Sequence, residues 1–235
     1  MTATATSRTV SALRPSFFQV MALLFAAVII YGFSFTIHDN LLHPPYPRPA
    51  ILYVHAVVFS SWVLLFFAQV TLVRSYRVDV HRRLGQWGLV HGAMIPVVGI
   101  ATAIAMTRLR VAHGELDAAG AIVVPCFDMI AFTSCFALGL ALRKQSEYHR
   151  RLMWMATAAL TAAAFGRMPA FDHAEWFYAG VDALILIGAL RDRVVLGLVH
   201  PVYKYGIPAM ISGQLLAAYV RGSGWWLGIA PKLFQ

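Results

Sequence analysis

The sequence has 235 residues, of which 60% are hydrophobic and 12% are charged, and its formal net charge is +9. Average soluble chains carry about twice that charged fraction, so the composition excludes an ordinary soluble protein and favours a membrane protein. The basic residues stand in short clusters between apolar runs, which is the pattern of membrane topology and not of a nucleic-acid-binding surface. We therefore expect the lipid bilayer as a partner and no nucleic acid.

Apolar runs of about 20 residues are long enough to cross a bilayer as helices. Seven runs reach or approach this length, at 17–37, 50–73, 85–107, 118–142, 152–170, 175–190 and 199–220. The sixth is short and the seventh contains Lys204 near its start, so six spans are the alternative. We expect an all-α polytopic membrane helix bundle with a single transmembrane domain over 17–220, between a cytoplasmic tail at 1–16 and an interfacial tail at 221–235.

Lysine and arginine favour one side of the expected bundle. The connections on the N-terminal side contain Arg8, Arg14, Arg74, Arg77, Arg82, Arg83, Arg143, Lys144, Arg150, Arg151, Arg191 and Arg193. The opposite side has fewer, namely Arg48, Arg108, Arg110, Arg167, Arg221 and Lys232. Cytoplasmic loops carry the excess of basic residues. The N-terminus is therefore predicted to be cytoplasmic, in a bacterial inner membrane.

The start of the third run places a histidine above a row of glycines. On a helical wheel, Gly85, Gly88 and Gly92 fall within roughly 40° of His81. Small residues in such a row let membrane helices approach closely. The alternative is that a flat ligand lies against the row.

The four residues that open this helix recur as His149-Arg150-Arg151-Leu152. Both helices are expected to start on the same side, two spans apart, which indicates a parallel repeat of two-helix units. His81 and His149 would then approach each other, with His200 at a similar depth. Histidine is the commonest transition-metal ligand, so the three form a candidate metal site. As an alternative, the histidines are ordinary members of basic interfacial clusters.

Several polar side chains fall inside the expected spans, where an ionisable residue is by default a candidate functional residue. They are His55, Gln69, His91, Asp128, Arg167 and Asp182. A buried histidine that bonds to a neighbouring helix is the ordinary case for His91 and His55. Asp182 and Arg167 could form a simple interhelical ion pair.

Two resemblances follow from these motifs. The pattern of His55-Ala56, Trp62 and Gln69, the two His-Arg-Arg-Leu helix starts, and His200-Pro201 resembles a group of uncharacterised bacterial multipass membrane proteins. More distantly, the helix start at His81 resembles the cytochrome b561-like family, whose four-helix core holds two b-type haems by histidine pairs. That resemblance implies electron transfer across a membrane. It implies an inner haem at His81 and His149, and an outer one near His55 with His91.

The leading hypothesis is a membrane protein that transfers electrons through a histidine-ligated cofactor. If the protein is an enzyme, this hypothesis makes it a membrane oxidoreductase. Haem b is the first choice, and a transition metal or no cofactor are the alternatives. Arg82 and Arg150 would hold the haem propionates, since guanidinium matches carboxylate in charge and geometry. A quinone or a redox protein would be the partner, and the chain could form a homo-oligomer.

Two other function classes compete with electron transfer. A proton-linked transporter of small solutes would use Asp128, His91 and Arg167 near mid-membrane. A metal-dependent lipid hydrolase would hold Zn²⁺ on three histidines and use an aspartate to activate water.

Overall fold

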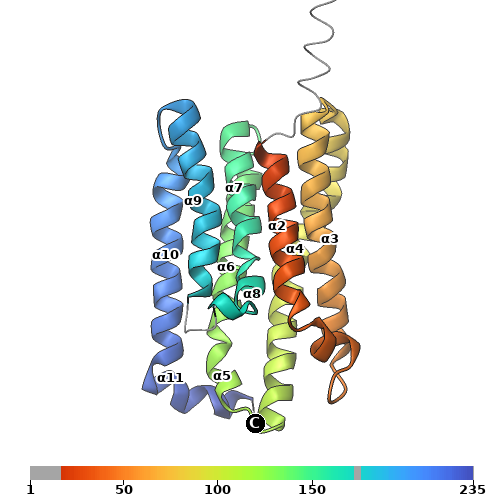
Figure 1. Cartoon of the computed structure of the whole chain (residues 1–235), viewed down its shortest axis with the longest axis vertical. Helices are drawn as coiled ribbons and strands as arrows, with labels where there is room; N and C mark the ends of the chain where they lie inside the picture. Colours follow the sequence, from red (N-terminus) through yellow and green to blue (C-terminus); the bar gives the residue numbers. More distant parts are fainter. Residues whose placement is uncertain (1–16, 172–175, 235) are drawn as a thin grey trace, which may run out of the picture.

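The computed structural model describes residues 17–171 and 176–234, and within them every regular element is helical. The long helices stand side by side in one bundle (Figure 1). This confirms the all-α prediction. The expected tail at 1–16 lies outside the described residues.

Four segments are long and apolar enough to cross a membrane. They are α2 (Phe17–Ser34), α3 (Ala50–Arg74), α4 (Val78–Ala112), and α5 (Asp117–Ala121) continued by α6 (Val123–Ala141). A short π-helix, η1 (His38–Leu42), follows α2. With 35 residues, α4 is about 52 Å long, so it extends well beyond the roughly 30 Å apolar core of a bilayer.

The expected helix over 152–170 is wrong in extent, because the structure divides this segment. It forms α7 (Ser146–Ala159), α8 (Ala162–Phe165) and the 3-10 helix η2 (Pro169–Phe171). At the break, the hydroxyl of Thr161 donates to the carbonyl of Ala158 at 2.6 Å, so a side chain takes up a backbone acceptor where the helix ends.

The final part of the chain forms a helical hairpin and a C-terminal turn. It comprises α9 (Phe177–Leu196), α10 (Pro201–Gly222), α11 (Gly224–Ile229) and the 3-10 helix η3 (Ala230–Leu233). With 20 residues, α9 is longer than the run expected at 175–190. It is capped by Gly197, whose φ of 74° is the left-handed geometry that glycine tolerates. Residues 172–175 lie outside the described part. The indole N–H of Trp226 in α11 donates to the Gly120 carbonyl of α5 at 3.0 Å, which ties the C-terminal turn to the bundle.

The centre of the bundle is α7. Every residue of Trp154–Ala159 is buried, and Trp154 packs against Phe25 of α2. Many large apolar side chains instead face outward, including Val57, Leu64, Val97, Leu190, Val194, Leu215 and Leu216. An apolar exterior around an apolar core suits a protein surrounded by lipid.

Two hairpins set the positions of the paired motifs. α3 packs on α4, α6 packs on α7, and α4 packs on α6. The α3–α4, α6–α7 and α9–α10 connections all lie at one end of the bundle, which we call the histidine end after His81 and His149 (Figure 1).

Candidate histidine pair at one end of the bundle

The structure brings His81 and His149 together at the histidine end. Their ring centroids are 6.4 Å apart and their planes are nearly perpendicular, at 85°. Each histidine lies near the start of the second helix of its hairpin, so α4 and α7 each contribute one ring. The helix pairing of α4 on α6 therefore places two identical side chains side by side.

Each ring is held by the first helix of its own hairpin. Nδ1 of His149 lies 2.8 Å from the carbonyl oxygen of Gly139 in α6. When the amide nitrogen of Gln69 in α3 faces His81, it donates to Nδ1 at 2.6 Å, while the amide oxygen accepts from the N–H of Gly85 at 3.0 Å. In both histidines Nδ1 is engaged, which fixes the ring orientation and leaves Nε2 for another partner.

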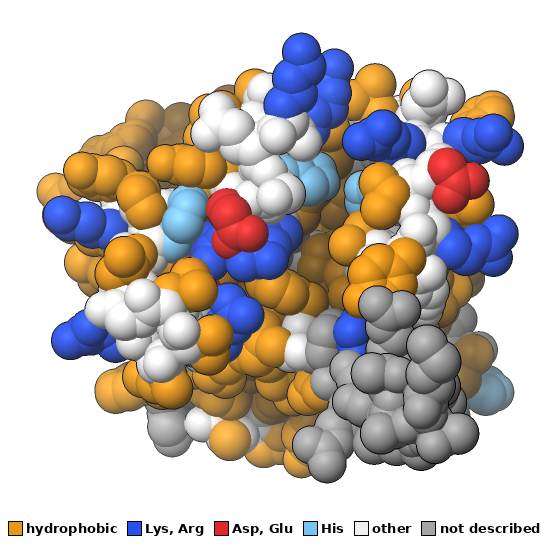
Figure 2. Space-filling view, turned by 90° about the horizontal axis from the view of Figure 1, so that it is seen from above, with side chains coloured by type: hydrophobic (Ala, Val, Ile, Leu, Met, Phe, Trp, Pro, Cys, Tyr) orange, Lys and Arg blue, Asp and Glu red, His pale blue; other side chains and the backbone are white. Residues whose placement is uncertain are grey.

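The arginines of the two motifs differ in environment. Arg82 is exposed, whereas the guanidinium of Arg150 donates to Glu147 and lies 5.1 Å from the centre of the Phe18 ring. Viewed from above, this end carries many basic side chains, and histidines border a recess between its two halves (Figure 2). The pair is therefore set in a positively charged face.

His200, the third member of the expected metal set, has a different role. Its Nδ1 accepts from the backbone N–H of Val202 at 3.3 Å and so caps α10, and its ring packs edge-on against Tyr148 at 4.6 Å. Among the described residues, no three His, Cys, Asp or Glu side chains are grouped so that they could hold a metal ion. The structure thus brings two of the three histidines together, and not all three.

The glycine row below His81 contacts neighbouring helices. A Cβ atom on Gly92 would lie 2.2 Å from Cζ of Phe136 in α6, so this aromatic ring fills the space over that glycine. Near His81 the row is less crowded: a Cβ on Gly85 would lie 3.5 Å from the Gln69 amide, and one on Gly88 would lie 3.4 Å from Leu65. Close helix packing, one of the two readings of the row, accounts for its lower part.

His55 and His91 do not form a second facing pair of the same kind. Nε2 of His91 lies 2.9 Å from the carbonyl oxygen of Val58, so this nitrogen binds the neighbouring helix. His55 stacks on Phe59 with ring centroids 3.9 Å apart, and its Nδ1 is buried without a hydrogen-bond partner. His91 thus has the ordinary interhelical contact expected of a buried histidine.

The two aspartates expected inside the spans, Asp128 and Asp182, each accept a hydrogen bond from a neutral side chain. The hydroxyl of Tyr178 donates to Asp128 at 3.1 Å, and the amide of Gln214 donates to Asp182 at 2.9 Å. Arg167 lies elsewhere: it donates to the Thr36 hydroxyl at 3.1 Å and lies over the ring of Phe33. The expected interhelical pair of Asp182 with Arg167 is therefore absent from these contacts.

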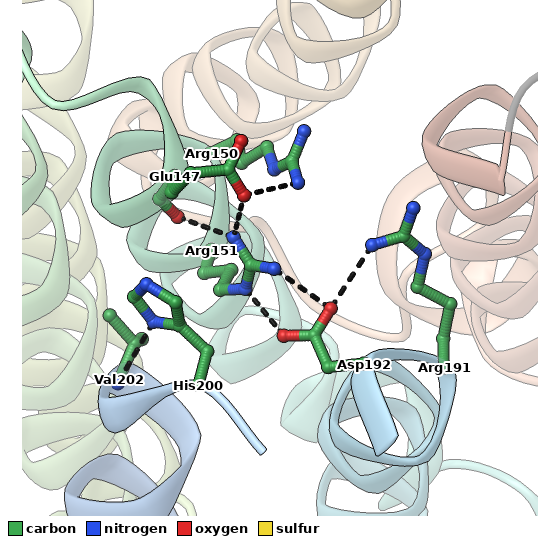
Figure 3. A network of polar contacts seen from close by, with 7 residues as sticks. All are labelled: Glu147, Arg150, Arg151, Arg191, Asp192, His200 and Val202. Carbon is green, nitrogen blue, oxygen red and sulfur yellow. Dashed lines mark hydrogen bonds and ion pairs between the residues drawn. The ribbon is translucent and has the colours of Figure 1, made fainter. Parts of the chain in front are cut away.

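Sequence reasoning missed an ion-pair network beside the histidine pair. Arg151 is fully buried, and its guanidinium donates two hydrogen bonds to Asp192 of α9, at 2.6 and 2.8 Å, and one to the Glu147 carboxylate at 2.6 Å (Figure 3). Arg191 adds a contact to Asp192 at 3.1 Å. The i, i+4 spacing of Glu147 and Arg151 could have indicated the first pair.

The network controls the ionisation of its two carboxyl groups. Burial by itself would raise the pKa of Asp192, but the hydrogen bonds and charges of Arg151 and Arg191 outweigh it and hold the pKa below its ordinary value. For Glu147 likewise, burial opposes the shift, and Arg151 and Arg150 lower the pKa. Both carboxylates are therefore ionised at neutral pH, and the pair of Asp192 with Arg151 ties α9 to α7.

Comparison of the chain with protein families, with curated proteins and with solved structures found no match.

Proposed function

We propose that the chain crosses a bacterial inner membrane seven times, with the histidine end in the cytoplasm. Beyond the four apolar segments, this adds the helices α7–α8, α9 and α10. The apolar exterior of α9 and α10 supports the additional spans, because large apolar side chains are exposed there, namely Leu190, Val194, Leu215 and Leu216. A helix as long as α9 rises about 30 Å, the thickness of the apolar core. The α3–α4 and α6–α7 hairpins would be the two copies of a parallel repeat.

At the cytoplasmic end, we propose that His81 and His149 would together hold one redox cofactor, which would supply electron transfer to or from a quinone or a protein partner. The separation of the two rings carries this proposal. A metal–imidazole bond is about 2.0–2.1 Å long, so two nitrogens bound to one metal lie about 4 Å apart and their ring centres roughly 6 Å apart. The observed centroid separation of 6.4 Å fits this requirement.

The number of histidines favours haem b over a bare ion. A protein-bound zinc ion takes three or four protein ligands, whereas haem supplies four nitrogens itself and needs two axial side chains. The pair supplies two. The same count weighs against a zinc-dependent hydrolase.

The two histidines suit a haem, but the surface along the glycine row does not. Phe136 and Leu65 occupy much of the space over Gly92 and Gly88, so the row is not a free wall for a macrocycle. We therefore limit the proposed site to the rim, where His81, His149 and the exposed Arg82 lie. Arg150 contacts Glu147 and the Phe18 ring of α2 instead of the pair, so it is left out of this rim site.

The protein's part in the reaction would be to orient the ligands and set their charge. The Gly139 carbonyl accepts from Nδ1 of His149, which leaves a lone pair on Nε2 of the neutral ring. For His81 the same state requires that Gln69 present its amide oxygen to Nδ1, which a rotation of the amide achieves. When bound, the cofactor would supply one-electron chemistry.

An absorption spectrum of the protein purified after expression with excess haem precursor tests this proposal. We expect the bands of a low-spin haem, lost in both His81→Ala and His149→Ala. His113→Ala is the matched control, since His113 is exposed and bonds to the Leu109 carbonyl of its own helix. A colourless wild-type protein, or a spectrum unchanged by either substitution, would refute haem ligation by the pair.

The transporter hypothesis has weaker support. Asp128, His91 and Arg167 each have their own partners on neighbouring helices, at Tyr178, Val58 and Thr36. Proteoliposome uptake that depends on Asp128, tested with Asp128→Asn, would restore it.

A further inference from the structure

Two arginines at the histidine end share one aromatic side chain. The guanidinium carbon of Arg150, in the first turn of α7, lies 5.1 Å from the ring centre of Phe18. That of Arg191, near the end of α9, lies 5.8 Å from the same centre and 5.6 Å from that of Phe17. All three distances are within the range of cation–π attraction. Three helices thus contribute to one cationic cluster, which comprises Phe17, Phe18, Arg150 and Arg191.

Most donor groups of these two arginines are left over. A guanidinium offers five N–H donors. Arg150 has one hydrogen bond, to Glu147, and its Nε is buried without a partner. Arg191 has one, to Asp192 at 3.1 Å. Arg151, by contrast, donates four hydrogen bonds, to the carboxylates of Asp192 and Glu147 and to the Glu147 carbonyl, so these acids are already committed.

A second unpartnered donor lies in the same cluster. Trp154 is completely buried, yet its indole N–H has no hydrogen-bond partner. Its ring stacks on Phe17 at 5.4 Å and meets Phe18 edge-on at 5.8 Å. A buried donor without a partner destabilises the fold unless an acceptor is supplied. The cluster therefore has hydrogen-bond donors without partners, on Arg150 and Trp154, and no acceptor for them.

The local charge balance points to an anion. Arg150, Arg151 and Arg191 face two carboxylates, those of Glu147 and Asp192, which leaves one positive charge in excess. Burial and the charges of Arg151 and Arg191 lower the pKa of Arg150, against the opposing effect of Glu147. Figure 3 shows Arg150 and Arg191 on one side of the Arg151–Asp192 pair and His200 on the other. The surplus charge is therefore concentrated on the side toward α2.

We propose that this cluster binds the phosphate group of an anionic phospholipid. Guanidinium groups match phosphate oxygens in geometry as well as in charge. The cluster lies at the end of the bundle where α2, the first apolar helix, begins, so it is at headgroup depth. The half-buried Phe17 and Phe18 offer an apolar surface beside it for the start of an acyl chain. This site is separate from the histidine pair and does not depend on a cofactor.

Native mass spectrometry of the detergent-purified full chain tests the proposal. Dioleoyl phosphatidylglycerol is the anionic probe, dioleoyl phosphatidylcholine the zwitterionic one, and sodium phosphate the headgroup alone. We expect the wild type to prefer phosphatidylglycerol, and Arg150→Gln with Arg191→Gln to weaken that binding by roughly tenfold or more. The matched control is Arg143→Gln with Lys144→Gln. It removes two exposed charges from the same end and is expected to change binding by less than about threefold.

Several outcomes would overturn the proposal. Equal losses in the two double variants would reduce the effect to general surface charge. Equal binding of the two lipids would remove the anion preference, and saturation by sodium phosphate at concentrations where the lipid does not bind would assign the site to free phosphate. Should the glutamine variant aggregate on gel filtration, Arg150→Lys with Arg191→Lys keeps both charges without the planar groups. That variant is expected to bind about threefold more weakly, and wild-type affinity in it would contradict the site.

Discussion

The two His-Arg-Arg-Leu segments have the same four residues and different surroundings. In the first, Arg83 and its neighbour Arg82 are exposed on the outer part of the bundle. In the second, Arg151 is fully buried between Glu147 and Asp192, because α7 is the central helix and α9 packs against it. The histidines lie at equivalent points, but the second arginines do not share a role. Position in the bundle decides whether a basic residue is a surface charge or a structural one.

The histidine anchors differ in the same way. His149 is held by a backbone carbonyl, at Gly139, which no substitution of a side chain can remove directly. His81 is held by the side-chain amide of Gln69, which can present either a donor or an acceptor. The second segment is therefore the rigid half of the pair and the first is the adjustable half.

The largest expected difference between the segments is in the free energy of unfolding that is lost when the environment of the second arginine, Arg151 or Arg83, is changed. Asp192→Ala leaves the guanidinium of Arg151 buried without its main partner, and breaking a buried ion pair in this way costs about 3–5 kcal/mol. Arg83→Ala, at the matching place in the first segment, should change the free energy of unfolding by no more than about 0.5 kcal/mol. Thermal unfolding in detergent measures both. Similar losses in the two variants would contradict the distinction.

The two segments should also differ in how much they contribute to the pH dependence of stability. The pKa values of Asp192 and Glu147 are lowered in the folded protein, so their contribution to stability is complete above the unfolded values, near 4, and is lost as the pH falls through the lower folded values. We expect the melting temperature of the wild type to fall more steeply below about pH 4 than that of Asp192→Asn, which lacks this titration. Arg83→Ala should keep the wild-type pH profile. Parallel profiles for wild type and Asp192→Asn would exclude a stabilising role of the Asp192 charge.

Hydropathy alone predicts much of the fold, because the long apolar runs become helices, although α4 begins at Val78 and ends at Ala112, well outside the expected run of 85–107. It fails for 152–170, where the hydroxyl of Thr161 and the nearby Pro169 interrupt an otherwise apolar helix. The proximity of His81 and His149 followed from the repeated motif. The partners of Asp128, Asp182 and Arg167 could not be predicted, since they depend on which helices pack together and at what rotation. The contacts of His200 with Val202 and Tyr148 could not be predicted for the same reason, because a shared depth along the bundle does not by itself bring side chains into contact.

The smallest effect concerns the glycine row beneath His81, where two substitutions on one helix make a matched test. Gly92→Ala would place a Cβ 2.2 Å from the Phe136 ring, which is itself confined between Phe132 and Trp62, so overpacking should cost about 1–3 kcal/mol. Gly85→Ala meets the Gln69 amide at an ordinary 3.5 Å and should change stability by less than about 0.5 kcal/mol. Thermal unfolding of the two variants in detergent gives the comparison. The opposite order would mean that the row is open at Gly92 and closed beside His81, which would return a flat ligand to the lower part of the row.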